Sequence, residues 1–216
     1  MHAARWRARA ALTLAALAVT TATTATTATP ATAASASAAR VATQSTGAQL
    51  AGVDYATWQR DVAAALSQAR PYIEQRTASP SGQRLAVVLD IDNTSLETDF
   101  HYFWEYPTPA VRPVLDLVRY ADSRGVDVFF VTARPGILHA PTAYNLRAVG
   151  YPVDGLYVRD LPDLFDEVSA YKTAKRTEIE AKGYTIIANI GNRPTDLVGG
   201  HAEKTFKLPD YDGKLS

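Results

Sequence analysis

The 216 residues include 22 basic and 22 acidic side chains and no cysteine, and 47% of the chain is apolar. This composition is ordinary for one soluble domain with a buried core, and the lack of cysteine excludes a disulfide framework and a thiolate metal site. The zero net charge gives no basic excess, so neither nucleic acid polymers nor anionic membranes are expected as the main partner.

The first 50 residues are compositionally distinct from the rest of the chain. Three arginines in the first ten residues precede an apolar run at residues 10–19, and Ala-Ser-Ala triplets follow at residues 34–38. This order predicts a secretory signal peptide at 1–36, a linker at 37–52 and one domain at 53–216. The apolar run is shorter than the about 20 residues that a membrane helix needs, so no membrane anchor is expected. The alternative is an Ala/Thr-rich disordered tail that stays on the protein.

Periodic apolar positions predict a helix at residues 55–73, kinked or restarted at Pro71, and a turn at 77–82. The run 85–89 is apolar without alternation, which is typical of a strand buried on both faces of a parallel sheet. An aromatic-rich excursion follows at 100–107, with five aromatic residues in its first seven positions.

Helices and strands alternate through the rest of the chain. Helices are predicted at residues 113–123, 140–149 and 169–182, and strands at 126–131, 156–158, 184–190 and, at the sheet edge, 206–208. The alternation predicts an α/β fold with a doubly wound parallel sheet and right-handed crossovers.

Two carboxylates follow the first buried strand at once. Ligands bind beyond the carboxyl ends of strands in such sheets, so Asp90 and Asp92 are expected in the crevice. One of them can serve as a nucleophile while the other carries a proton.

The segment Asp-Ile-Asp-Asn-Thr at 90–94 resembles the first motif of haloacid dehalogenase (HAD) superfamily phosphatases, and residues 129–134, 172–176 and 190–196 resemble the other three. The branch that the motifs resemble is subfamily IIIB, the class B and class C secreted acid phosphatases, which includes plant vegetative storage proteins. The resemblance implies a HAD-like doubly wound parallel sheet with helices on both faces. It also implies a small cap-like excursion after the first motif.

The resemblance also implies roles for individual residues. Asp90 would attack phosphorus to give an aspartyl-phosphate, and Asp92 would protonate the leaving group and later draw a proton from water. Thr132 would donate to a phosphoryl oxygen, and Lys172 would neutralise developing charge. Arg134 would contact phosphate or substrate, or else pair with a nearby acid.

The family resemblance further implies a divalent cation, Mg²⁺ first, held by Asp90, the Asp92 main-chain carbonyl, Asn192 and Asp196. The family usually has aspartate where this chain has Asn192, which predicts weaker metal binding. In the excursion, Trp104 and Phe103 are the candidates to stack on a leaving group, and the other rings are expected to pack at the rim.

Together these features predict a secreted, metal-dependent acid phosphatase acting on small phosphomonoesters. Two alternatives stay open: a non-catalytic binding or storage protein on the same scaffold, and a nucleotidase or phosphotransferase.

Overall fold

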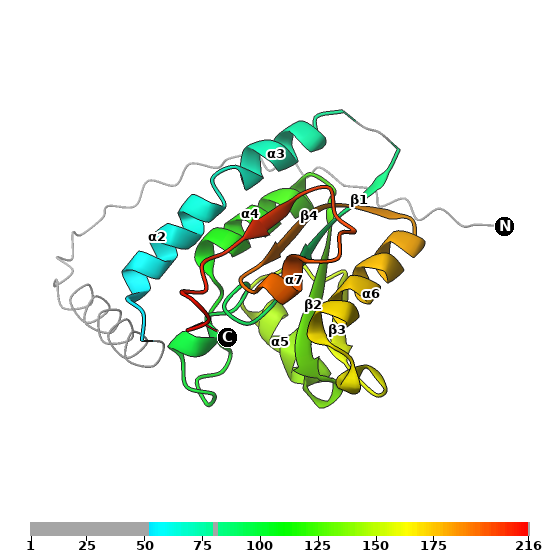
Figure 1. Ribbon diagram of the computed structural model, residues 1–216. Helices are drawn as coiled ribbons and strands as arrows, with labels where there is room; N and C mark the ends of the chain where they lie inside the picture. Colours follow the sequence, from blue (N-terminus) through cyan, green and yellow to red (C-terminus); the bar gives the residue numbers. More distant parts are fainter. Residues whose placement is uncertain (1–51, 80–81, 216) are drawn as a thin grey trace, which may run out of the picture.

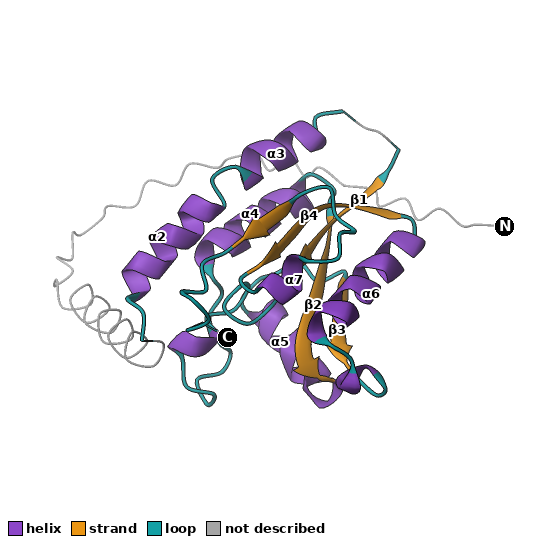
Figure 2. Ribbon diagram, viewed as in Figure 1, coloured by secondary structure: helices purple, strands orange, loops and turns teal. Residues whose placement is uncertain are grey.

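The computed structural model describes residues 52–79 and 82–215, which form a parallel five-stranded sheet between two helical layers (Figure 1). The strand order is β3-β2-β1-β4-β5, and every neighbouring pair is parallel. Figure 2 shows the strands running in one direction. The strands are β1 Arg84–Leu89, β2 Asp127–Pro135, β3 Gly155–Arg159, β4 Tyr184–Gly191 and β5 Thr205–Lys207.

The helices lie on both faces of the sheet, as Figure 1 shows. On one face of the sheet, a large apolar cluster packs the four helices α2, α3, α4 and α5 against the strands. On the other face, a smaller cluster packs α6 through Tyr171 and Ile179. The helices are α2 Tyr55–Ala65, α3 Ala69–Arg76, α4 Arg112–Ser123, α5 His139–Ala148, α6 Val168–Ala181 and α7 Pro194–Leu197. The predicted doubly wound parallel sheet is therefore confirmed.

The order of the strands determines where in the sheet a ligand-binding crevice lies. The chain moves outward from β1 through β2 to β3 and then returns to the other side of β1 as β4. Such a reversal leaves a crevice beyond the carboxyl ends of the two strands that flank it. The segments that follow β1 and β4 therefore meet there.

Three local features differ from the sequence prediction. The first helix stops at Ala65 and restarts at Ala69, so Pro71 lies in the first turn of α3, where its missing N–H costs nothing. Strand β2 continues to Pro135, which pairs with Arg159 after an irregularity in the ladder. Short 3-10 turns occur at Thr98–Phe100, Gly136–Leu138 and Asp163–Phe165.

The aromatic excursion has an anchored base and an exposed tip. Phe100 is buried and stacks on Trp58 of α2, with ring centroids 4.3 Å apart. Phe103 and Trp104 are 91% and 63% exposed, and Trp104 stacks on Tyr102 at 4.5 Å. Most of these rings therefore lie at the rim, as predicted.

No helix in the described part of the chain is long and apolar enough to cross a membrane. The predicted signal peptide and nearly all of the predicted linker lie outside the described residues.

Candidate active site

Asp90 lies where β1 enters the crevice. Its main-chain N–H donates to the Ile190 carbonyl at 3.0 Å, and its carbonyl accepts from the Ser95 hydroxyl at 2.6 Å. Asn93 adopts φ +54°, a left-handed conformation that asparagine tolerates better than most residues. The turn after β1 is thus fixed by its own hydrogen bonds, and Asp90 is only 7% exposed.

The Lys172 ammonium lies between two carboxylates, one directly after β1 and the other in α7, which follows β4. Lys172 extends from α6 and donates to Asp90 Oδ1 at 2.5 Å and to Asp196 Oδ1 at 2.6 Å. All three side chains are buried. The arrangement joins the ends of β1 and β4 through one cation.

Burial and neighbouring charges shift the pKa values of Asp90 and Lys172. Loss of hydration raises the pKa of Asp90 to about 7, and the nearby charges of Asp196 and Asp92 act in the same direction, against the lowering effect of Lys172. Burial would lower the pKa of Lys172, but the two carboxylates outweigh it and raise that pKa. A further positive charge beside Asp90 would therefore favour its ionised, nucleophilic form.

Asp92 is held by a bidentate ion pair and a hydroxyl. Arg134 donates through Nε to Asp92 Oδ2 at 3.0 Å and through Nη2 to Oδ1 at 2.6 Å. The Thr98 hydroxyl donates to the same Oδ1 at 2.8 Å, and Arg134 also reaches Thr142. Of the two contacts proposed for Arg134, the structure contains the one with an acid.

Thr132 is fully buried in β2, three residues before the strand ends, and its hydroxyl accepts from the Arg134 main-chain N–H at 3.2 Å. The hydroxyl therefore lies at the same end of the sheet as Asp90, which directly follows β1.

The fourth motif follows β4. The Asn192 amide oxygen accepts from the Thr94 hydroxyl at 3.1 Å, and its amide nitrogen donates to the Leu215 carbonyl at 3.4 Å. Asp196 Oδ2 accepts from the Arg193 N–H at 2.7 Å. A Cβ at Gly191 would overlap Asp196, so this close approach requires glycine there.

The donor chemistry of the crevice fits a hard cation, because the candidate ligands are all oxygens. The described residues hold no group of three or more His, Asp or Glu side chains placed around one metal position. The expected ligand set, which adds the Asp92 main-chain carbonyl and the Asn192 amide to Asp90 and Asp196, stays a prediction. The charge lost at position 192 leaves Asp90 and Asp196 as the carboxylates of the set.

Sequence reasoning missed Thr98, which has no motif of its own and lies in an unpredicted 3-10 turn. It also placed Trp104 near the substrate. The ring contacts of Trp104 within the described residues are with Tyr102 and Phe103 of the same excursion. Its role in binding stays a prediction.

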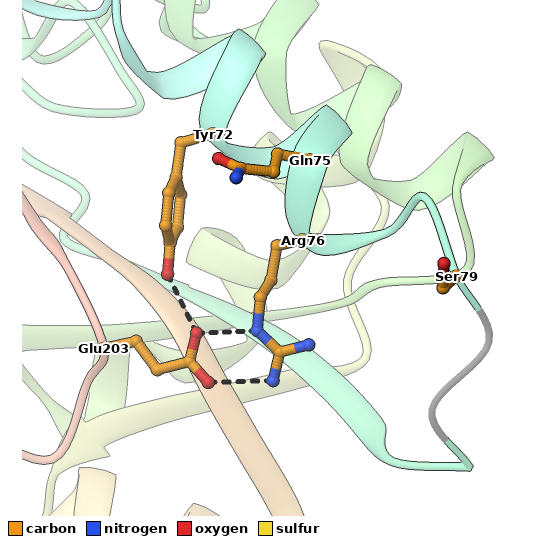
Figure 3. A pocket seen from close by; sticks show the side chains of 5 residues that line it. All are labelled: Tyr72, Gln75, Arg76, Ser79 and Glu203. Atoms are coloured by element: carbon orange, nitrogen blue, oxygen red, sulfur yellow. Dashed lines mark hydrogen bonds and ion pairs between the residues drawn. The ribbon is translucent and has the colours of Figure 1, made fainter.

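A separate hollow of about 510 Å³ lies beside α3 (Figure 3). Tyr72 and Arg76 both point to Glu203, and Arg76 pairs with it through two nitrogens at 2.8 Å. These polar groups satisfy one another. The crevice at the strand ends is therefore the candidate active site.

A polar cluster fastens the excursion to α2. Buried Glu97 accepts from Tyr55 and Gln59, each at 2.8 Å. His101 lies 3.3 Å from Glu97 and 3.1 Å from Glu105 through its two ring nitrogens. Burial would lower the pKa of His101, but the hydrogen bonds with both glutamates outweigh it and raise the pKa.

This raised pKa predicts a pH-dependent stability. A histidine whose folded pKa exceeds the unfolded value of about 6.5 stabilises the fold below that pH, and the contribution is lost as pH rises through the folded pKa. His101→Asn should therefore lower the melting temperature more at pH 5 than at pH 8. The control His139→Asn, at an exposed site, should lower it equally at both. An equal loss of melting temperature at both pH values for His101→Asn would contradict a protonated His101 between Glu97 and Glu105.

Comparison with known proteins identifies a family whose model matches most of this chain. A model of the HAD superfamily, subfamily IIIB (acid phosphatase), matches residues 9–214. The chain is 34% identical over 106 residues to a stem 28 kDa glycoprotein of Glycine max, which covers 47% of this chain and 42% of that protein. It is 27% identical over 143 residues to vegetative storage protein 1 of Arabidopsis thaliana, covering 57% and 53%. The chain thus spans about half the length of the curated relatives it matches.

Among solved structures, a class C acid phosphatase from Bacillus anthracis superposes with a TM-score of 0.57. The alignment covers 73% of this chain and 79% of that one at 18% identity. A likeness at this identity establishes a shared fold.

Proposed function

The chain belongs to the HAD superfamily, subfamily IIIB (acid phosphatase), and we propose that it hydrolyses small phosphomonoesters through an aspartyl-phosphate. The family expected from the four sequence motifs is confirmed by this match. The observation that carries the proposal is the buried Asp90 carboxylate, which faces the crevice with Lys172 at 2.5 Å.

In the first step, an Asp90 oxygen forms a bond to phosphorus while the bond from phosphorus to the ester oxygen breaks. Asp92 gives its proton to that departing oxygen. Arg134 and Thr98 hold the Asp92 carboxyl in place for this transfer. In the second step, water attacks the aspartyl-phosphate, Asp92 accepts the proton, and inorganic phosphate and free Asp90 result.

Two residues would serve the phosphoryl group. Lys172 would neutralise charge on its oxygens, and the Thr132 hydroxyl would donate to one of them. A bound phosphoryl group would compete with Asp90 for the Lys172 ammonium, so the ion pair is a resting arrangement. At the rim, Trp104 and Phe103 would contact the leaving group.

Asp90, the Asp92 main-chain carbonyl, Asn192 and Asp196 would hold a divalent cation, Mg²⁺ first. When bound, such a cation supplies positive charge that offsets the charge of the phosphate. Because Asn192 carries no charge, Asp90 and Asp196 would provide the electrostatic part of the affinity.

Hydrolysis of a chromogenic aryl phosphate tests the function. The mature protein should be active at acidic pH with Mg²⁺, lose activity with a chelator and regain it when Mg²⁺ is restored. Activity that a chelator leaves unchanged would exclude the metal, and no hydrolysis at any pH would support the storage alternative. That alternative is not favoured, because the four residues that the proposed chemistry needs are all present: Asp90, Asp92, Thr132 and Lys172.

We also propose that the protein is exported. The arginines and the apolar run of the first 19 residues motivate this, together with the Ala-Ser-Ala triplets. N-terminal sequencing of exported material should find a first residue between Ser37 and Ala39. Recovery of a membrane-embedded form that begins at Met1 would contradict the proposal.

A further inference from the structure

Arg176 is a buried cation that the proposed chemistry does not use. It lies on α6 one turn after Lys172, so both side chains are on the same helix face, and it is 1% exposed. Arginine is almost never fully buried unless it is paired. Its burial therefore requires an explanation.

The Arg176 guanidinium binds neutral oxygens. Nε donates to the Gly200 carbonyl and Nη1 to the Asp196 carbonyl, each at 2.9 Å. Nη2 donates to the Val198 carbonyl and to the Thr173 hydroxyl. The guanidinium thus fastens the segment after α7 to α6. No salt bridge from Arg176 to a carboxylate occurs among the described residues.

The positive charge of Arg176 remains even though burial lowers its pKa, because a guanidinium stays protonated in proteins. Arg176 lines the same small enclosed gap as Asp90, Lys172 and Asp196. Charge in such a place is weakly screened. Two carboxylates act on this charge: Asp196, in the crevice, and Glu180, one turn further along α6. Glu180 is exposed and pairs with His201, so Asp196 is the buried one of the two.

Counting Arg176 balances the charges of the site. Without it, three carboxylates face two cationic side chains; with it, the formal charges are equal. The six side chains are Asp90, Asp92, Asp196, Lys172, Arg134 and Arg176. A site with equal charges can accept an anion, whereas the same site with one fewer cation favours a second cation instead.

We propose that Arg176 is a positioning residue that holds Asp196 against Lys172 and whose buried charge raises the affinity of the crevice for a phosphate anion at the expense of the cation. The inference rests on the proposed function, since it assigns the anion and the cation to that site. It predicts opposite effects on the two ligands. A residue that only stabilised the fold would weaken both.

The test measures binding of inorganic phosphate and of Mg²⁺ separately, by calorimetry, to the full mature protein. Arg176→Gln keeps hydrogen-bond donors and removes the charge. Because the lost Arg176 charge is partly screened, we expect phosphate to bind about tenfold more weakly. Mg²⁺ should bind roughly threefold to tenfold more tightly. Arg176→Lys keeps the charge and should leave both affinities within about twofold, while lowering the melting temperature because hydrogen bonds are lost.

The matched control is Lys175→Gln, which removes a positive charge from the same helix, where Lys175 is half-buried and pairs with Asp163 and Glu178. It should change neither affinity, because two carboxylates outside the crevice already neutralise the Lys175 charge, and solvent reaches all three side chains. Weakening of both ligands, or of neither, in Arg176→Gln would overturn the inference. If Arg176→Gln does not fold, a tenfold loss of phosphate binding in Arg176→Lys would overturn it, and retention would support it. A parent protein that binds neither ligand would instead refute the proposed function.

Discussion

Asp90→Asn is expected to abolish phosphatase activity, by at least about 10⁴-fold, which is within the loss seen when a hydrolase loses its nucleophile. An amide has nearly the same shape as the carboxylate but is a poor nucleophile, so no aspartyl-phosphate forms. The measurements are turnover of an aryl phosphate and the mass of protein quenched with substrate. The parent should gain one phosphoryl group, and the variant should gain none.

The fold of this variant should persist. The amide keeps hydrogen-bonding atoms beside Lys172 and removes a carboxylate that lies near Asp196 and Asp92. Its circular dichroism and melting temperature should therefore stay close to those of the parent. Asp122→Asn, an exposed site on α4, is the charge-matched control and should keep full activity. Turnover by Asp90→Asn at the parent rate would identify another nucleophile.

Lys172→Met should lose both activity and stability. Removing the ammonium leaves the Asp90 and Asp196 carboxylates buried without their common partner, and breaking a buried ion pair in this way costs about 3–5 kcal/mol of unfolding free energy. Loss of the charge that would face the phosphoryl oxygens should lower turnover by roughly 10²–10³-fold. Denaturant unfolding and aryl phosphate hydrolysis measure the two effects.

The stability loss in Lys172→Met should depend on pH. Lys172 lowers the pKa of Asp90, so its removal leaves burial and the neighbouring carboxylates to raise that pKa further. A carboxyl whose folded pKa exceeds the unfolded one binds its proton more tightly in the folded state, so stability increases as pH falls. The variant should therefore recover part of its loss between pH 7 and pH 5. Lys175→Met, three residues along the helix, is the control, and a Lys172→Met protein as stable as the parent at pH 7 would exclude the buried ion pairs.

Local pattern was sufficient to predict the core of this molecule. The apolar run of β1 and the carboxylates after it located the candidate nucleophile and its strand, because burial on both faces leaves no room for polar residues. The parallel strand ends then had to meet at one edge. The restart expected at Pro71 occurs two residues earlier, at Ala69, because proline is also tolerated within the first turn of a helix.

The missed features depend on contacts between distant parts of the chain. The Asn192 side chain donates a hydrogen bond to the Leu215 carbonyl, 23 positions later, and no local sequence pattern predicts that partner. Arg176 lies in a helix where arginine would normally face solvent, and its carbonyl partners at Asp196 and Gly200 are 20 and 24 positions later in the chain. Thr98 reaches Asp92 because the excursion is anchored by Phe100.

The buried base and exposed tip of the excursion allow tryptophan fluorescence to report on two different events in this protein. Of the three tryptophans, one lies at position 6, within the predicted leader, so the mature chain would keep a fully buried indole at Trp58 and a largely exposed one at Trp104. Trp58→Phe would leave a fluorophore at the rim, whose emission should be quenched by an aryl phosphate if that ring contacts the leaving group. Trp104→Phe would leave a fluorophore stacked on Phe100, whose emission should change when the core unfolds. One pair of variants thus separates ligand binding at the tip from unfolding at the base.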